Sequence, residues 1–243
     1  MTFFFWGLCG TLFLLLMTSV GAAAVFLLRR PLPRRWEGLV LGFAAGVMSA
    51  AGIWSLLLPA LQQAGAAGSA VPWLPAAAGL AAGTALLARL DRIVARRGGT
   101  AALLPAAITL HNIPEGLAVG LGFAMVENAA GLAGAWALAL GIGIQNIPEG
   151  TAISLPLRQQ GMSRGRAFAR GVLSGVVEPL AGMSVFLAAG LLRSAMPWLL
   201  SFAAGAMLYV VVEELIPQGK ETHGCLGFTV GFLLMMVLDT ALG

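Results

Sequence analysis

The hexapeptide His111-Asn112-Ile113-Pro114-Glu115-Gly116 returns 34 residues later as Gln145-Asn146-Ile147-Pro148-Glu149-Gly150. Both copies lie inside long apolar runs, where this chain places few carboxylates. On a helix, the first and fifth residues of each copy share one face, one turn apart. Each proline lacks a backbone N–H, so it frees the carbonyl one turn earlier, Leu110 or Ile144, and interrupts the helix. The doublet therefore predicts two ligand-rich, interrupted half-sites that face each other as a metal centre within a membrane.

Composition indicates the class of protein. Of the 243 residues, 59% are hydrophobic and only 10% are charged, and the mean hydropathy is +0.91. A soluble domain carries about a quarter charged residues. The apolar stretches are continuous rather than alternating, which favours helices over a barrel. Cys9 and Cys225 are too few for a disulfide framework or a cysteine zinc site. We expect an all-α integral membrane protein. Its basic residues are not gathered into a patch of the kind that binds nucleic acid, so we expect no nucleic-acid partner.

Eight apolar runs are near or above the roughly 20 residues that span a bilayer core. They cover residues 3–28, 37–60, 71–94, 101–125, 130–156, 167–192, 197–216 and 223–242. Little chain remains for a soluble domain, so residues 1–243 are predicted to form a single transmembrane domain. The first run lacks a preceding basic segment and is too long for the apolar part of a signal peptide, so we interpret it as a retained helix.

The basic residues orient the eight predicted helices. If all eight runs span the membrane, thirteen of the fourteen positive charges fall on one side, and only Arg193 falls on the other. The thirteen are Arg29, Arg30, Arg34, Arg35, Arg89, Arg92, Arg96, Arg97, Arg158, Arg164, Arg166, Arg170 and Lys220. By the positive-inside rule, that side is cytoplasmic. Both termini are therefore predicted to lie outside.

The motifs are predicted to lie near the middle of the membrane. His111 follows Arg97 by 14 residues, and Gln145 precedes Arg158 by 13, distances of about 20 Å on a helix. Glu178, in the sixth run, has a similar depth. Because the fourth and fifth helices run in opposite directions, the two copies are related by inversion, as in inverted-repeat transporters. The metal site is accordingly expected between helices 4, 5 and 6.

The chemistry of these side chains suits a metal ion. A charge at the membrane centre costs several kcal/mol, so buried acids there are functional candidates. Imidazole, amide oxygen and carboxylate ligands suit divalent first-row ions, and imidazole favours zinc-like ones. A structural alternative is that Glu115 and Glu149 are protonated and hydrogen-bond between helices, but the adjacent His, Gln and Asn residues favour ligation. Glu178, before Pro179, is a weaker candidate that its depth strengthens.

At these residues the chain resembles the ZIP (Zrt/Irt-like) family of divalent metal transporters, bacterial type. The resemblance also covers Glu178-Pro179, Gly42-Phe43-Ala44-Ala45-Gly46 and the final Leu238-Asp239-Thr240-Ala241-Leu242-Gly243. It implies a binuclear centre in which Glu115 and Glu149 are shared. The first site would be His111, Glu115, Gln145 and Glu149, and the second would add Asn112, Asn146 and Glu178. It further implies a multi-pass protein of the bacterial cytoplasmic (inner) membrane, with the lipid bilayer as its surroundings and a homodimer among the oligomeric states left open.

The resemblance also implies a route for the ion. Ser55 and Gln62 would form the outer entrance and Asp91 and Glu214 the cytoplasmic exit, and the rest of the transport pathway would use Glu213 and Asp239. The outer apolar gate would be Ala51, Leu138 and Ile142. The chain departs from the family pattern at three positions, with Asn146 where relatives often carry Asp, Gln62 for an acid and Glu213 for a His. From the residues alone, Asp91 and the adjacent acids could equally be solvated.

We therefore predict a transporter, not an enzyme, that moves divalent transition-metal cations into the cytoplasm. Zn²⁺ is the expected substrate, and Cd²⁺, Fe²⁺ and Mn²⁺ are left open. The alternative from another class is a metal-dependent intramembrane hydrolase, which would use the centre to activate water. The sequence lacks the His-Glu-x-x-His motif of metalloproteases, and each mid-membrane acid is already needed as a ligand. A third interpretation is a transporter of another solute, in which the motif serves structure.

Overall fold

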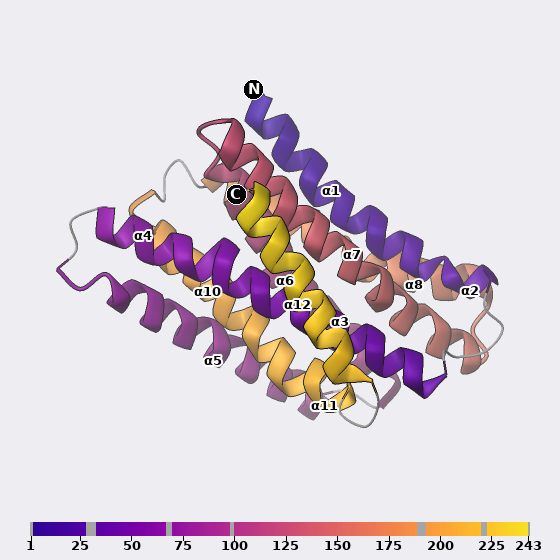
Figure 1. Ribbon diagram of the computed structural model, residues 1–243. Coiled ribbons are helices and arrows are strands. Elements are labelled where there is room, and N and C mark those ends of the chain that lie inside the picture. Colours follow the sequence, from indigo (N-terminus) through magenta and orange to yellow (C-terminus); the bar gives the residue numbers. More distant parts are fainter. Residues whose placement is uncertain are drawn as a thin grey trace.

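Long helices packed side by side make up the computed structural model in Figure 1. It describes residues 2–27, 33–66, 70–97, 100–188, 193–219 and 223–242. Every regular element in these ranges is helical, which confirms the all-α prediction. The two ends of the chain lie at the same end of the bundle, and α11 lies at the other (Figure 1).

Each of the eight predicted runs contains a helix. In chain order the elements are α1 (Thr2–Ala22), α2 (Ala24–Leu27), α3 (Arg34–Ala51), η1 (Gly52–Leu57), α4 (Leu58–Ala66), α5 (Trp73–Arg97), α6 (Thr100–Ala124), α7 (Ala129–Gln159), α8 (Arg164–Gly175), α9 (Val177–Ala188), η2 (Arg193–Ala195), α10 (Met196–Val210), η3 (Val211–Leu215), α11 (Ile216–Gly219) and α12 (Gly224–Leu242). Within the described residues, seven helical stretches are long and apolar enough to cross a membrane. The eighth span would be α6, whose first half carries side chains outside the described set, so that span stays a prediction.

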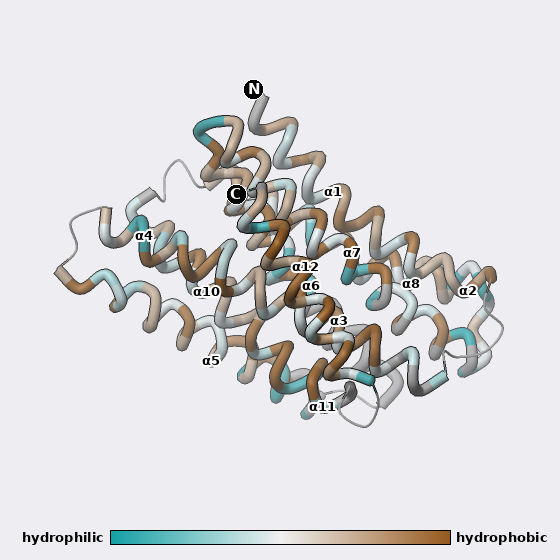
Figure 2. Tube along the Cα trace, in the orientation of Figure 1, coloured by the Kyte–Doolittle hydropathy of each residue, from teal (hydrophilic) through white to brown (hydrophobic). Residues whose placement is uncertain are grey.

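The outer surface of the bundle is apolar. Leu27, Leu180 and Leu187 are 85%, 65% and 66% exposed, and many other large hydrophobic side chains are also exposed. Figure 2 shows apolar segments along the length of the helices. A water-soluble protein rarely exposes a continuous apolar surface of this kind. The described helices therefore form a multi-pass membrane protein.

The helices gather into two groups. One group contains α1, α2 and α6 to α9, and the other contains α3 to α5 and α10 to α12. Between the groups, α7 packs on α3 and α12, and α6 packs on α10 and α5. The two helices that carry the repeated motif therefore line the boundary between the groups.

Glycines let the paired helices approach closely. A Cβ atom at Gly42 of α3 would overlap the carbonyl oxygen of Gly224 at the start of α12, and one at Gly46 would overlap that of Phe228. Such contact between small residues is the usual way in which transmembrane helices pack. Gly42 and Gly46 therefore bring α3 and α12 into close contact.

The predicted interruption of the motif helices is wrong in the described structure. α6 runs through Pro114 and α7 runs through Pro148 as continuous α-helices. Proline removes one backbone donor, and the remaining helical hydrogen bonds carry the helix past it. The irregular turns lie instead in η1 and η3, which are π-helical.

Candidate metal centre

The two copies of the motif meet through a side-chain hydrogen bond. Gln145 on α7 donates from Nε2 to Oε1 of Glu115 on α6 over 2.6 Å. Both side chains are fully buried, as is Asn146. A short bond to an ionisable group in a dry interior fixes both side chains. Motifs 34 residues apart in sequence thus form one polar centre.

A third helix adds a further acid. Glu178 on α9 is fully buried, and its carboxyl group and that of Glu149 lie close enough to Glu115 to repel its charge. Asn146 lies beside Glu178. Like charges brought together in a low-dielectric interior repel strongly, and a cation between them reverses the sign of the interaction. Three carboxyl groups from the fourth, fifth and sixth runs therefore lie close together, an arrangement that a cation would stabilise.

Several side-chain oxygen atoms in the described part of this centre accept no hydrogen bond. Asn112 donates from Nδ2 to the carbonyl oxygen of Ser174 over 3.0 Å, which leaves its Oδ1 for another partner. Within the described part of the chain, the buried oxygens without a hydrogen-bond donor include Asn112 Oδ1, Glu115 Oε2, Gln145 Oε1 and Glu178 Oε2. A buried acceptor left without a partner costs free energy. Carboxylate and amide oxygens aimed at one place can recover that cost by binding a cation.

The predicted ligand set also includes His111. The side chain of His111 lies outside the described residues, although the residue itself belongs to α6. Among the side chains that the structure describes, no group of three His, Cys, Asp or Glu residues is arranged to hold a metal ion alone. The polar side chains gathered here are instead a mixture of carboxylates and amides.

Thr18 is a member of the centre that sequence reasoning missed. Its Oγ1 lies 3.0 Å from Oε1 of Glu178 and 3.1 Å from the carbonyl oxygen of Leu14, and the side chain is fully buried in α1. Because a hydroxyl has one proton, it can donate to the carboxylate or to the backbone. Thr11, about two turns earlier on the same side of α1, donates to the backbone carbonyls of Gly7 and Leu8 in its own helix. Nothing in the sequence separates these two threonines.

The glycine that ends each motif brings the neighbouring helix close. A Cβ atom at Gly116 would overlap the carbonyl oxygen of Glu178, and one at Gly150 would overlap that of Thr18. The first contact packs α6 on α9, and the second packs α7 on α1. The same two glycines therefore place Glu178 and Thr18 beside the repeated motifs.

One of the two predicted entrance residues, Ser55, lies on an irregular helix. Ser55, in η1, donates to Oδ1 of Asp239 on α12 over 2.6 Å, and both are partly buried. Gln62, one helical segment later on α4, is exposed. The structure thus pairs Ser55 with Asp239 and leaves Gln62 apart from that hydrogen bond.

The acids of the predicted route on the cytoplasmic side lie on a second irregular helix and on α5. Glu213 and Glu214 belong to η3, and Asp91 on α5 accepts a hydrogen bond of 3.0 Å from the hydroxyl of Tyr209 on α10. Tyr209, the one tyrosine in the chain, is a partner that sequence reasoning missed. All three acids lie close enough to Tyr209 to act on it electrostatically, so they form one acidic group.

A common sequence feature explains both irregular turns. The N–H of Leu58 bonds to Ile53, five residues back, and the N–H of Ile216 bonds to Val211 in the same way. Each of these donors directly precedes a proline, Pro59 or Pro217. A proline within a helix leaves the carbonyl four residues earlier without its donor, and π-turns are frequent at functional sites. Both irregular turns contain residues of the predicted route, Ser55 in η1 and Glu213 and Glu214 in η3.

The predicted outer gate is part of the apolar core. Ala51, Leu138 and Ile142 are at most 1% exposed and pack within one hydrophobic cluster. Leu138 and Ile142 lie on α7, less than two turns before Gln145. Leu138 and Ile142 therefore place buried apolar side chains on the N-terminal side of the centre along α7.

Apolar spans around a buried group of carboxylates and amides define a class, that of helical membrane proteins with an intramembrane polar centre. Residues 90–239 match the model of the ZIP zinc transporter family. The chain is 39% identical to the zinc transporter GufA of Myxococcus xanthus, over 98% of this chain and 99% of that one. It is 41% identical to the zinc transporter ZIPB of Bordetella bronchiseptica, over 93% and 78% of the two chains.

The similarity extends to animals. The human zinc transporter ZIP11 is 35% identical, and the match covers 98% of both chains. Relatives of this identity, matched over nearly the whole chain, show the family. The chain belongs to the ZIP family of transporters, which confirms the resemblance noted at the repeated motif.

Proposed function

We propose that this protein carries Zn²⁺ and similar divalent cations through the membrane into the cytoplasm. One observation carries the proposal: the fully buried Glu115, hydrogen-bonded to Gln145, lies beside two further carboxylates in the interior of an apolar helical bundle. An acidic group of this kind is costly in a membrane protein that has no use for it. The names of the relatives, all zinc transporters, support zinc as the substrate.

The proposed centre has two parts. His111, Glu115, Gln145 and Glu149 hold the first ion, and Asn112, Asn146 and Glu178 hold a second with the two shared glutamates. Their oxygens without hydrogen-bond donors support this assignment for Asn112, Glu115, Gln145 and Glu178. Zinc is commonly four-coordinate with nitrogen and oxygen ligands, and the first set supplies four such side chains.

The proposed route runs between the two helix groups. Ser55, Gln62 and Asp239 receive the ion outside, Ala51, Leu138 and Ile142 close the outer side, and the acids Asp91, Glu213 and Glu214 release it inside. In this orientation all eight helices span the membrane and both termini lie outside. The buried apolar side chains of Ala51, Leu138 and Ile142, on the proposed outer side of the centre, support release toward the cytoplasm. A cation that moved back through this dry region would lose its hydration without gaining new ligands.

Zinc uptake by reconstituted vesicles tests this function. Vesicles that contain the protein and a zinc-sensitive dye are expected to accumulate Zn²⁺ faster than protein-free vesicles, and Cd²⁺ added outside should compete. Uptake equal to that of protein-free vesicles, in protein shown to be folded, would contradict the proposal. Family membership already favours transport over the intramembrane hydrolase.

A further inference from the structure

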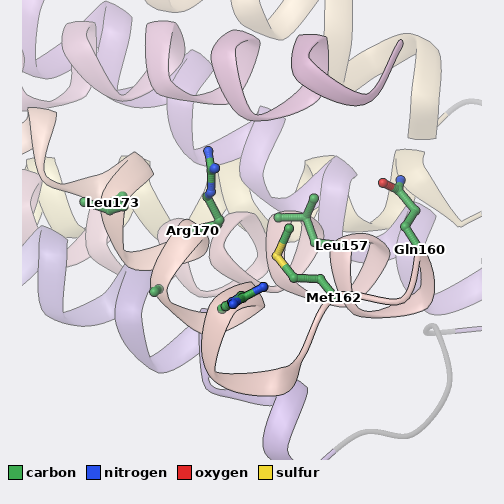
Figure 3. Close-up of a pocket in the computed structure, with 7 residues that line it drawn as sticks. Leu157, Gln160, Met162, Arg170 and Leu173 are labelled. Carbon is green, nitrogen blue, oxygen red and sulfur yellow. The ribbon is translucent and has the colours of Figure 1, made fainter. Parts of the chain in front are cut away.

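A cavity of about 620 Å³ lies where α7 ends and α8 begins, outside the metal centre. Figure 3 shows its lining, in which apolar side chains and arginines come together. The lining residues are Leu157, Gln160, Met162, Arg166, Ala169, Arg170 and Leu173. None of them belongs to the proposed ion route, so the cavity needs a separate explanation.

The floor of the cavity is fixed by the turn after α7. Gly161 has φ +96°, its N–H bonds to the carbonyl of Arg158 over 3.2 Å, and the N–H of Met162 bonds to the carbonyl of Leu157 over 3.1 Å. These bonds form a Schellman motif, which brings the residue after the glycine onto the last turn of the helix. Met162 accordingly packs against the cluster that contains Leu157, and Arg158 donates to its carbonyl oxygen. The floor is thus apolar and held by the backbone.

The rim of the cavity is strongly basic. Arg166 and Arg170 stand four residues apart on α8, and both are exposed. Like charges at this spacing repel and destabilise a helix. The chain offers no local counter-charge, because no Asp or Glu occurs between Glu149 and Glu178. An anion from outside the protein would relieve the repulsion.

An apolar stripe leads away from this basic rim. Leu173, Leu180 and Leu187 are 60%, 65% and 66% exposed and are spaced seven residues apart. Seven residues is close to two helical turns, so Leu173 shares a face of α8 with Arg166, and Leu180 shares a face of α9 with Leu187. All three arginines of the candidate membrane span Arg164–Ala188 lie within its first seven residues, so we expect them at the membrane surface and the leucines within the hydrocarbon.

We propose that this cavity binds one anionic phospholipid, with its phosphate at Arg166 and Arg170 and an acyl chain along Leu173, Leu180 and Leu187. Basic pockets at the ends of transmembrane helices are suited to anionic headgroups, and the guanidinium group matches phosphate geometry. The apolar floor and the leucine stripe favour a lipid over a free phosphate ion, which would use only the arginines.

Lipid binding by the purified protein, measured by native mass spectrometry, tests this site. Phosphatidylglycerol is expected to bind the wild type at least about tenfold more tightly than phosphatidylcholine or inorganic phosphate. The double variant Arg166→Gln/Arg170→Gln should lose about tenfold in phosphatidylglycerol affinity. Arg92→Gln/Arg96→Gln is the matched control, because these arginines are also exposed and four residues apart, on α5. It should bind phosphatidylglycerol like the wild type.

A further variant separates lipid from phosphate. Leu173→Asn replaces an exposed leucine next to the arginines, so it should weaken phosphatidylglycerol binding several-fold and leave phosphate binding unchanged. An equal loss in both arginine double variants would show a general attraction to the basic face and overturn the proposal. Equal affinity for phosphate and phosphatidylglycerol, unaffected by Leu173→Asn, would show an anion site without a lipid and overturn it as well.

Discussion

At the scale of single residues, Thr18 offers the most selective test of how the centre is held. The hydroxyl that reaches Glu178 fixes one carboxyl oxygen and leaves the other for the ion. Thr18→Val keeps the shape and removes the donor, so we expect weaker binding of a second ion and slower transport. Thr18→Ser keeps the hydroxyl and should restore both. Zinc titration measures the number of bound ions, and zinc uptake by vesicles measures the transport rate. A Thr18→Val variant with the wild-type number of bound ions and the wild-type uptake rate would exclude a role for Thr18 in positioning Glu178.

Asn146 carries a second prediction at this scale. Two dications bring a charge of +4, whereas Glu115, Glu149 and Glu178 together supply −3. A residual charge is costly in a low-dielectric interior, since unit charges at about 4 Å interact by about 4 kcal/mol even at an effective dielectric of 20. We expect the wild type to hold one ion tightly and the second weakly, and Asn146→Asp to raise the stoichiometry toward two. Metal analysis of purified protein would contradict this if the wild type held two ions equally.

The sequence was sufficient to find the centre but not its surroundings. The repeated motif identified Glu115 and Gln145 because buried polar residues at helical spacing are rare in apolar runs. It could not identify Thr18, since a threonine that bonds to its own helix is ordinary in a membrane span. It also misplaced the helix irregularities, because the effect of a proline depends on how the neighbouring helices hold the chain. The prolines that coincide with π-turns are Pro59 and Pro217, not those of the motif.

At the scale of the elements, glycine contacts decide how closely the helices pair. A Cβ at Gly42 would overlap a backbone oxygen of α12, whereas the Cβ site at Gly65 on α4 is open. Gly42→Ala should therefore destabilise the protein by about 1–3 kcal/mol, the usual cost of overpacking. Gly65→Ala should be neutral or stabilising by up to about 1 kcal/mol, because alanine favours helix. Thermal unfolding in detergent compares them, and equal midpoints would show that α3 and α12 tolerate separation.

At the scale of the whole molecule, the distribution of charge predicts the orientation in the membrane. Both chain ends lie at the same end of the helix bundle (Figure 1), as an even number of spans requires. Single cysteines at either terminus or within residues 61–70 should react with impermeant reagents from outside, in a variant whose Cys9 and Cys225 are replaced. Cysteines within residues 96–100 should react only from the cytoplasmic side. Labelling of residues 96–100 from the same side as the N-terminus would contradict eight spans.

The central claim is that the buried carboxylates carry the ion, and zinc flux through charge-neutralised variants measures it most directly. Glu115→Gln and Glu149→Gln remove a charge with almost no change in volume, so both proteins should fold and insert. Glu127→Gln is the matched control, because Glu127 is exposed in the turn between α6 and α7. In reconstituted vesicles, we predict that zinc uptake falls to the protein-free level for Glu115→Gln and Glu149→Gln and stays at the wild-type rate for Glu127→Gln. Wild-type uptake by Glu149→Gln and Glu115→Gln would show that the ion takes another path.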